Sequence, residues 1–112
     1  MGRKVLGELE HLLLVAILRR GDDAYGAAII GEIERRTGQE LSRAGAYIAL
    51  QRLERKELIS ARDGEQTADR GGRPRRYFEL TSAGRAKLDA SAASLFAMWE
   101  GLSRDAIEAD SQ

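Results

Sequence analysis

The sequence contains no cysteine, and this absence excludes disulfide bonds, thiolate metal sites and a cysteine nucleophile. The sequence has a single histidine, His11, and one imidazole cannot form a metal site that needs several. The longest apolar run, residues 12–18, falls far short of the roughly 20 residues that span a bilayer. Residues 1–6 carry basic side chains without the apolar core of a signal peptide. We therefore expect a cytoplasmic protein that binds no metal and no membrane.

Residue patterns that support catalysis are absent as well. The sequence has no phosphate-binding loop ahead of a helix, and the Gly71-Gly72 pair is too short to form one. It shows neither a nucleophile with an evident general base nor carboxylates spaced as a catalytic pair. We expect neither an enzyme nor a bound cofactor.

Net charge is also lacking, because 18 basic residues balance 18 acidic ones. The charges are nevertheless unevenly distributed. Residues 70–76 contain four arginines and no acid, whereas residues 100–112 hold four acids and one arginine. Arginine holds phosphate and guanine edges with a planar fork, so residues 70–76 are the candidate for contact with nucleic acid. The alternative is a solubilising loop, which the nearby Asp63, Glu65 and Asp69 favour.

A short amphipathic helix is predicted shortly before this basic segment. Residues 42–57 place Ala46, Leu50 and Leu53 on one face, and Ser42 is a good N-cap. The opposite side carries long side chains, nearly all of them hydrogen-bond donors, on a rod of the width that fits a DNA major groove. These are Arg43, Tyr47, Gln51, Arg52 and Arg55. The alternative is the solvated face of an ordinary core helix.

Two short strands, residues 58–62 and 75–80, are predicted around a hairpin tip at residues 63–72. Two further helices, residues 6–19 and 24–37, precede the basic helix. The second of them has two candidate capping residues, Asp22 and Asp23. Helices followed by a basic hairpin form a winged helix-turn-helix, so the expected fold is mainly α with a small β-hairpin.

The last predicted helix, residues 82–107, starts at a good N-cap, Thr81. Its apolar residues are spaced by four, three, four and three, which is a heptad pattern. They are Leu88, Ala92, Leu95, Trp99 and Leu102. Because such a helix has more apolar surface than one small domain can cover, we expect a homodimer. The chain thus divides into a winged unit at residues 1–80 and a dimerisation helix with an acidic tail at residues 81–112.

The chain resembles the PadR-like family of transcriptional regulators over nearly its whole length. Four motifs in order carry this resemblance: Tyr25-Gly26, residues 42–54, Arg70-Gly71-Gly72-Arg73 and residues 77–84. The chain departs from the usual family sequence at Ala46 and Ile48, on either side of Tyr47. It also departs at Glu57, where a glycine is more typical.

The resemblance implies a homodimer that binds a DNA operator and regulates a promoter, in the simplest case as a repressor. It also implies pairing of subunits through the last helix. Together with the side-chain chemistry above, it gives a set of candidate DNA-binding residues. These are Tyr25, Ser42, Arg43, Ala44, Tyr47, Gln51, Arg52, Arg70, Arg73, Arg75 and Arg76. For Tyr25, a packed tyrosine is an equal alternative to a phosphate contact.

Trp99 has two interpretations. It is either an anchor of the dimer, which we favour because large aromatic residues dominate interface energetics, or part of a site for a small aromatic effector, which the resemblance implies. A different function also remains open. The chain is then a winged-helix interaction module whose last helix binds a partner protein, an alternative that the acidic tail and zero net charge favour.

Overall fold

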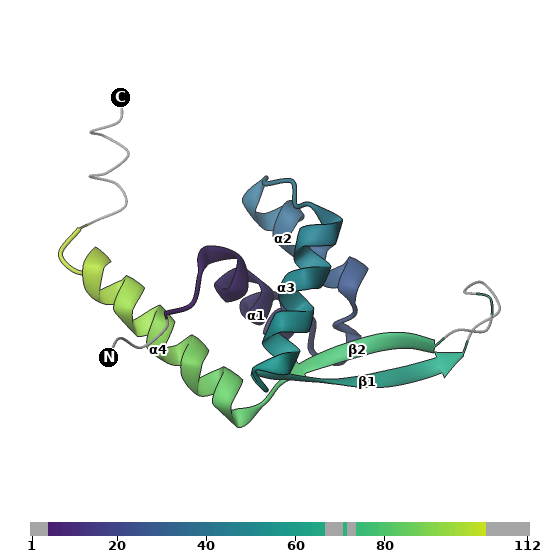
Figure 1. Cartoon of the computed structure of the whole chain (residues 1–112). Coiled ribbons are helices and arrows are strands. Elements are labelled where there is room, and N and C mark those ends of the chain that lie inside the picture. The colour runs from purple at the N-terminus through teal and green to yellow at the C-terminus, as the bar shows by residue number, and fades with distance from the viewer. Residues whose placement is uncertain (1–4, 67–70, 72–73, 103–112) are drawn as a thin grey trace.

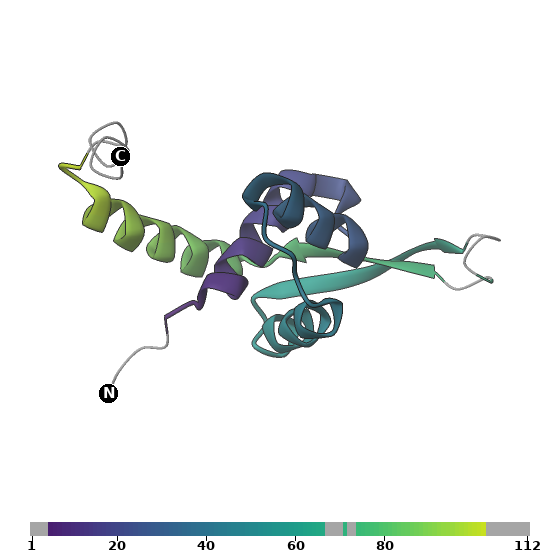
Figure 2. The same ribbon diagram turned by 90° about the horizontal axis from the view of Figure 1, so that it is seen from above.

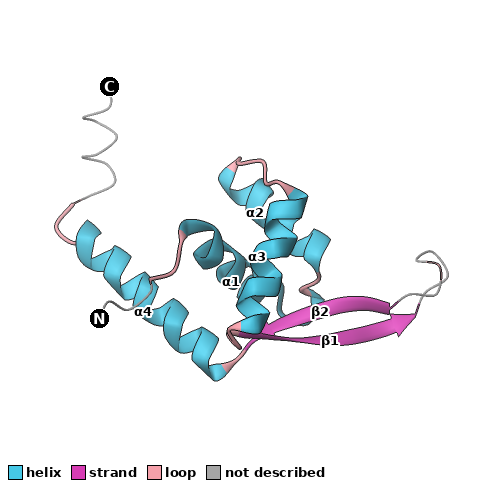
Figure 3. Cartoon of the chain, in the orientation of Figure 1, coloured by secondary structure: helices cyan, strands magenta, loops and turns pink. Residues whose placement is uncertain are grey.

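The computed structural model of the chain describes residues 5–66, 71 and 74–102. Three helices, α1 (Glu8–Arg20), α2 (Gly26–Thr37) and α3 (Arg43–Arg55), form a bundle. An antiparallel hairpin of β1 (Ile59–Gln66) and β2 (Pro74–Leu80) follows, and then α4 (Ser82–Trp99). The hairpin and α4 extend from opposite sides of the bundle, as Figures 1 and 2 show in two views and Figure 3 shows by element type. This is the mainly helical winged arrangement that the sequence predicted.

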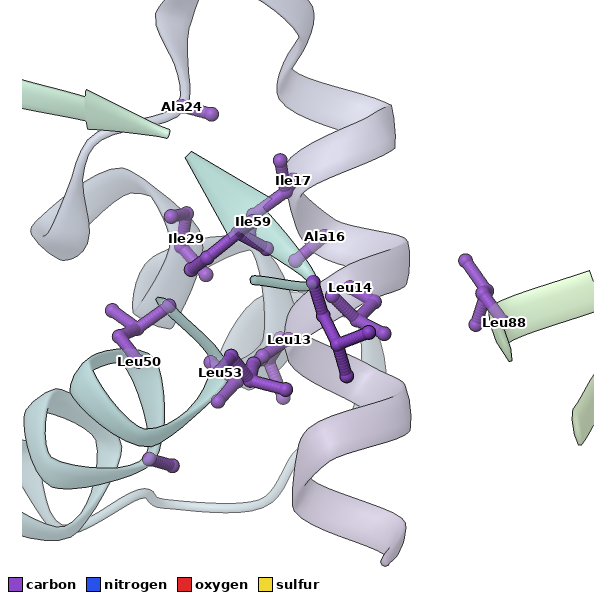
Figure 4. Packing of buried hydrophobic residues seen from close by; sticks show 13 residues of the cluster. Leu13, Leu14, Ala16, Ile17, Ala24, Ile29, Leu50, Leu53, Ile59 and Leu88 are labelled. Atoms are coloured by element: carbon purple, nitrogen blue, oxygen red, sulfur yellow. The ribbon is translucent and has the colours of Figure 1, made fainter. Parts of the chain in front are cut away.

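A single apolar core joins these elements. It is built on Leu13, Leu14 and Ile17 of α1, which are at most 2% exposed (Figure 4). The core also includes Ile29 of α2, Leu50 and Leu53 of α3, Ile59 of β1 and Leu88 of α4. The core fixes α3 against α1 and β1, so that the polar side of α3 faces outward.

Two N-caps have the predicted geometry. Ser42 Oγ accepts a hydrogen bond from the Gly45 amide at 3.1 Å, at the start of α3. Thr81 Oγ1 accepts one from the Gly84 amide at 3.0 Å, at the start of α4. Both satisfy an amide that the first helical turn leaves without a partner.

The second helix begins at Gly26, two residues later than predicted. Gly21–Asp23 forms a short 3-10 helix, and Tyr25 is extended and pairs with Tyr77 in an antiparallel bridge. Ala24 contributes to the same pairing, because its carbonyl accepts a hydrogen bond from the Phe78 amide at 2.8 Å. The prediction that Asp22 and Asp23 cap this helix is therefore wrong. The chain before α2 is used instead to attach the hairpin to the bundle.

Other boundaries differ by a few residues. The strands extend farther toward the tip than predicted, to Gln66 and from Pro74. The first helix starts at Glu8 rather than at residue 6, and the third ends at Arg55. The last helix ends at Trp99 rather than near residue 107. Glu100 has extended backbone angles and Gly101 has a positive φ of 87°. Glu57 takes the left-handed conformation with φ 62°, which explains why glycine suits this position.

Candidate nucleic-acid interface

Five of the predicted DNA-binding residues line one open hollow of about 390 Å³. Its walls are the start of α2, the outer side of α3 and the first residues of β2. The five residues are Tyr25, Tyr47, Gln51, Arg75 and Arg76. The fold thus brings together side chains from three elements that are far apart in the sequence. The hollow presents aromatic rings, an amide and two guanidinium groups on one surface.

Tyr25 is half-buried and holds the hairpin. The guanidinium carbon of Arg75 lies 4.1 Å from the centroid of its ring. Its ring also meets the edge of the Tyr77 ring, with centroids 5.8 Å apart and planes at 79°. Arg62 covers the Tyr77 ring in turn, 4.7 Å from its centroid. Such cation–π contacts are favourable by about 0.5–1 kcal/mol each at exposed sites. Tyr25 therefore packs against side chains of the hairpin, as one of its two predicted roles requires.

Tyr47 rests on Gly26. A Cβ atom at position 26 would lie 2.4 Å from Tyr47 Cε1, which is too close for two non-bonded carbon atoms. Glycine at this position lets the tyrosine ring of α3 lie against the first turn of α2. The ring is still 42% exposed, so one side of it faces solvent. This contact gives a physical reason for the Tyr25-Gly26 motif.

The N-terminal end of α3 is the most accessible part of the basic helix. Ser42, Arg43 and Ala44 are all exposed there. Backbone amides and the positive end of the helix dipole favour an anion at this end. Ala44 adds little bulk, which permits close approach of a nucleic-acid backbone or a base edge.

Arg52 does not line the hollow with the other candidates. It is exposed, and its charge acts on Glu10 of α1, whose carboxylate accepts a hydrogen bond from Lys56 Nζ at 3.0 Å. Partial burial raises the pKa of Glu10, but the hydrogen bonds from Lys56 and the Gly7 amide and the charges of Lys56 and Arg52 outweigh it. The pKa is therefore lowered. Two further candidates, Arg70 and Arg73, lie outside the described residues.

Sequence patterns missed two ion-pair sites. Arg76 Nη2 donates to Glu54 Oε2 at 2.6 Å, across the hollow between β2 and α3. Glu32 of α2 is buried and accepts hydrogen bonds from arginines of α1 and α2. The i, i+3 and i, i+4 spacing of the α2 arginines relative to Glu32 was a visible signal for part of this cluster. Its members are Arg19, Arg20, Arg35 and Arg36.

The predicted heptad residues have different surroundings, and Leu102 lies beyond the end of α4 at Trp99, so the predicted helical spacing does not extend to it. Leu88 is 4% exposed in the core of its own chain, and Ala92 is partly buried. Leu95, Trp99 and Leu102 are 51%, 53% and 59% exposed. Apolar surface continues on two further residues of this segment, Phe96 and Met98. An exposed patch of large apolar residues on one helix is typical of a protein contact surface, and in this chain it begins beyond Leu88.

In the part of the chain that the structure describes, no helix has the length and apolar character needed to cross a bilayer. Residues 5–66, 71 and 74–102 likewise contain no group of three or more histidine, aspartate or glutamate side chains placed to hold a metal ion.

Comparison with known proteins agrees with this geometry. Residues 13–90 match the family described as the transcriptional regulator PadR-like family. The chain is 38% identical over 86 residues to an uncharacterised protein of Lysinibacillus sphaericus, covering 75% of this chain and 74% of the relative.

Two solved structures share the fold. Bacillus subtilis PadR in complex with operator DNA matches with a TM-score of 0.63 and 21% identity, over 74% of this chain and 45% of that chain. Bordetella bronchiseptica BpsR, whose DNA binding is regulated by 6-hydroxynicotinic acid, matches with a TM-score of 0.63 and 18% identity, over 94% and 74% of the two chains. The chain has the winged helix-turn-helix fold of the solved structures that it matches. With the family match over most of its length, the chain belongs to the PadR-like family of transcriptional regulators and is not an enzyme.

Proposed function

We propose that this regulator acts as a homodimeric repressor on a promoter operator. The observation that carries the proposal is the hollow at which α2, α3 and β2 bring together Tyr25, Tyr47, Gln51, Arg75 and Arg76. In the proposed complex, α3 enters the major groove, where Arg43 and Gln51 are the candidates for contact with base edges. The hairpin then lies along the phosphate backbone, and Arg75 and Arg76 contribute positive charge there.

The apolar patch of α4 supports the dimer. Leu95, Phe96, Met98, Trp99 and Leu102 are exposed in the single chain, and burying them against a second copy removes this surface from water. In a symmetric dimer, two copies of α3 would enter successive major grooves about 34 Å apart, roughly one helical turn of DNA. Bound across a promoter, such a dimer would block access of the transcription machinery.

Binding to the DNA upstream of the protein's own coding region tests this function. We expect tight binding that resists unrelated competitor DNA and weakens steeply with salt, because arginine–phosphate contacts release counterions. Substituting Arg43→Ala together with Gln51→Ala should remove specific binding and leave the dimer intact. Binding that is equal on both DNAs would contradict an operator at this position. An absence of salt-dependent binding would instead favour the protein-interaction module, whose α4 patch holds a different protein.

A small aromatic effector is a separate part of the proposal. Trp99 lines an open hollow of about 670 Å³ on α4, together with Phe96 and Leu102. BpsR, which shares the fold, is regulated by the aromatic compound 6-hydroxynicotinic acid. Titration of aromatic acids against the fluorescence of Trp99 tests for such a site, because Trp99 is the one tryptophan in the chain. An unchanged signal across the panel, with unchanged DNA affinity, would leave Trp99 as an anchor of the dimer.

A further inference from the structure

Glu54 is an acid on the side of α3 that the hollow exposes. It lines the hollow beside Tyr47 and Gln51, one turn of helix beyond Gln51. Its side chain is 33% exposed. A carboxylate at this place would face the phosphates or base edges of any DNA that Tyr47 and Gln51 approach. In the structure this carboxylate is paired with an arginine, because Arg76 Nη2 donates a hydrogen bond to Glu54 Oε2 at 2.6 Å.

This pair joins α3 to the hairpin. Arg76 comes from β2 and Glu54 from α3, 22 residues apart, where the end of α3 lies close to the base of the hairpin (Figure 1). The Arg76 guanidinium also lies 6.0 Å from the centroid of the Phe78 ring. These contacts hold Arg76 over the hollow. Its side chain is nevertheless 56% exposed, so an anion can reach it from solvent.

The neighbouring arginine has a different arrangement. Arg75 stacks on the ring of Tyr25, a contact that an aromatic ring and a cation can keep while the cation also binds phosphate. A carboxylate and a phosphate, by contrast, compete for one guanidinium as anions of the same charge sign. Because Arg76 is paired with Glu54, its contact with phosphate depends on what Glu54 does.

We infer that Glu54 is a specificity-determining residue that competes with DNA phosphate for Arg76 and so suppresses binding to non-operator DNA. The inference rests on the proposed DNA contact of the hairpin. On arbitrary DNA, binding depends almost entirely on phosphate contacts, so an arginine held by a carboxylate costs that complex a large share of its affinity. On the operator, base contacts made by α3 supply much of the discrimination, so the same loss matters less.

The test compares Glu54→Gln with the wild-type chain on operator DNA and on unrelated DNA across a salt series. We expect affinity for unrelated DNA to rise by roughly tenfold at low salt, with a smaller rise on the operator, so the specificity ratio falls. The salt slope on unrelated DNA should steepen by about 1.8 units for a dimer, because one additional phosphate contact per subunit releases about 0.9 counterions.

Two matched variants separate this effect from general charge. Glu79→Gln removes the same charge from an exposed position on β2. It should change binding to unrelated DNA much less than Glu54→Gln does. In an Arg76→Gln background, Glu54→Gln should no longer raise affinity for unrelated DNA, because the arginine that it releases is absent.

Three results would overturn the inference. The first is an equal gain in affinity for unrelated DNA from Glu54→Gln and Glu79→Gln, and the second is a gain from Glu54→Gln that persists in the Arg76→Gln background. The third is that Glu54→Gln lowers operator affinity and that this loss depends on a single cytosine of the operator, which would make Glu54 a base-reading residue. Failure of the proposed function has a different signature, since then neither the wild-type chain nor Glu54→Gln binds any DNA in a salt-dependent manner.

Discussion

At the scale of single residues, Glu32 is the charged side chain that lies buried among those the structure describes. Its two oxygens accept hydrogen bonds from Arg35 Nη2 at 2.8 Å and Arg36 Nε at 2.7 Å. Arg19 and Arg20 reach the same carboxylate from α1 at 3.4 and 3.5 Å. The cluster ties the end of α1 to the middle of α2. A buried carboxylate with this many donors is an anchor for the helical bundle, because removing its charge takes one anionic partner from several arginines at once.

The first prediction concerns pH. The hydrogen bond from Arg36, with the charges of Arg35 and the other arginines, outweighs burial and lowers the pKa of Glu32 from its ordinary value of 4.5. A carboxyl group with a lowered folded-state pKa contributes stability that is fully present above its unfolded pKa. This contribution is lost as pH falls through the folded pKa. Urea unfolding should therefore show lower stability below about pH 4.5, and Glu32→Gln should be less stable than wild type at pH 7.

The two curves should also converge in acid. If Glu32→Gln and the wild-type chain lose stability in parallel between pH 7 and pH 3, the carboxylate of Glu32 is not the source of the pH dependence. Glu10→Gln provides a comparison, because the lowered pKa of Glu10 depends on Lys56, the Gly7 amide and Arg52 and not on the arginines around Glu32.

The contacts of a residue could be predicted from the sequence where its partner lies a few residues away. The caps Ser42 and Thr81 followed from residue type and position alone, because an N-cap bonds to an amide three residues away. The pair of Glu54 and Arg76 did not, since it depends on how the hairpin packs against α3. No periodicity within either element encodes the distance between them. The Gly26–Tyr47 contact was hidden for the same reason.

At the scale of elements, the start of α4 is fixed by a close backbone approach. A Cβ atom at Gly84 would lie 1.9 Å from the carbonyl oxygen of Leu58, in the turn between α3 and β1. The same carbonyl accepts a hydrogen bond from the Thr81 amide at 3.1 Å. Thr81 Oγ1 also donates to the Glu57 carbonyl at 2.7 Å. These contacts set the direction in which α4 leaves the bundle, and with it the geometry of any dimer built on α4.

The second prediction follows from this approach. Gly84→Ala should lower the free energy of unfolding by about 3 kcal/mol, because the added methyl group meets backbone atoms that cannot rotate away. Gly31→Ala is the matched control, since a Cβ atom there meets nothing closer than Arg35 Nη1 at 3.7 Å. It should raise stability by about 0.5–1 kcal/mol through better helix propensity. Chemical unfolding measures both, and a Gly84→Ala variant as stable as wild type would refute the close packing.

The existence and order of the elements were predictable, but the attachment of the hairpin was not. Apart from the end of α4, apolar periodicity and caps predicted the four helices and two strands close to where they lie. The pairing of Tyr25 with Tyr77 was missed because it joins a linker to a strand more than fifty residues later. The same pairing explains the error at the start of α2, where two aspartates looked like caps. Tertiary contacts, not local propensity, decided this boundary.

At the scale of the whole molecule, the winged unit and the apolar end of α4 lie apart. The hairpin extends to one side of the bundle and α4 to the other (Figure 2). Large apolar side chains are exposed at the far end of α4, whereas Leu88 near its start belongs to the core. A dimer formed there would leave both copies of α3 uncovered. Two weak DNA contacts would then act together, because the second subunit binds at a high effective concentration once the first is bound.

The last prediction tests this coupling. Leu95→Asp places a charge in the apolar patch at the end of α4 and should convert the proposed dimer to a monomer of 12.3 kDa in light scattering. Operator affinity should fall by about 100-fold or more, since the linked second contact is lost. Leu18→Asp makes the same change at a leucine that is 42% exposed on α1, and should leave both the dimer and operator binding unchanged. If Leu95→Asp stays dimeric, the subunits pair through another surface; if it becomes monomeric and binds the operator as tightly as wild type, each chain recognises DNA alone.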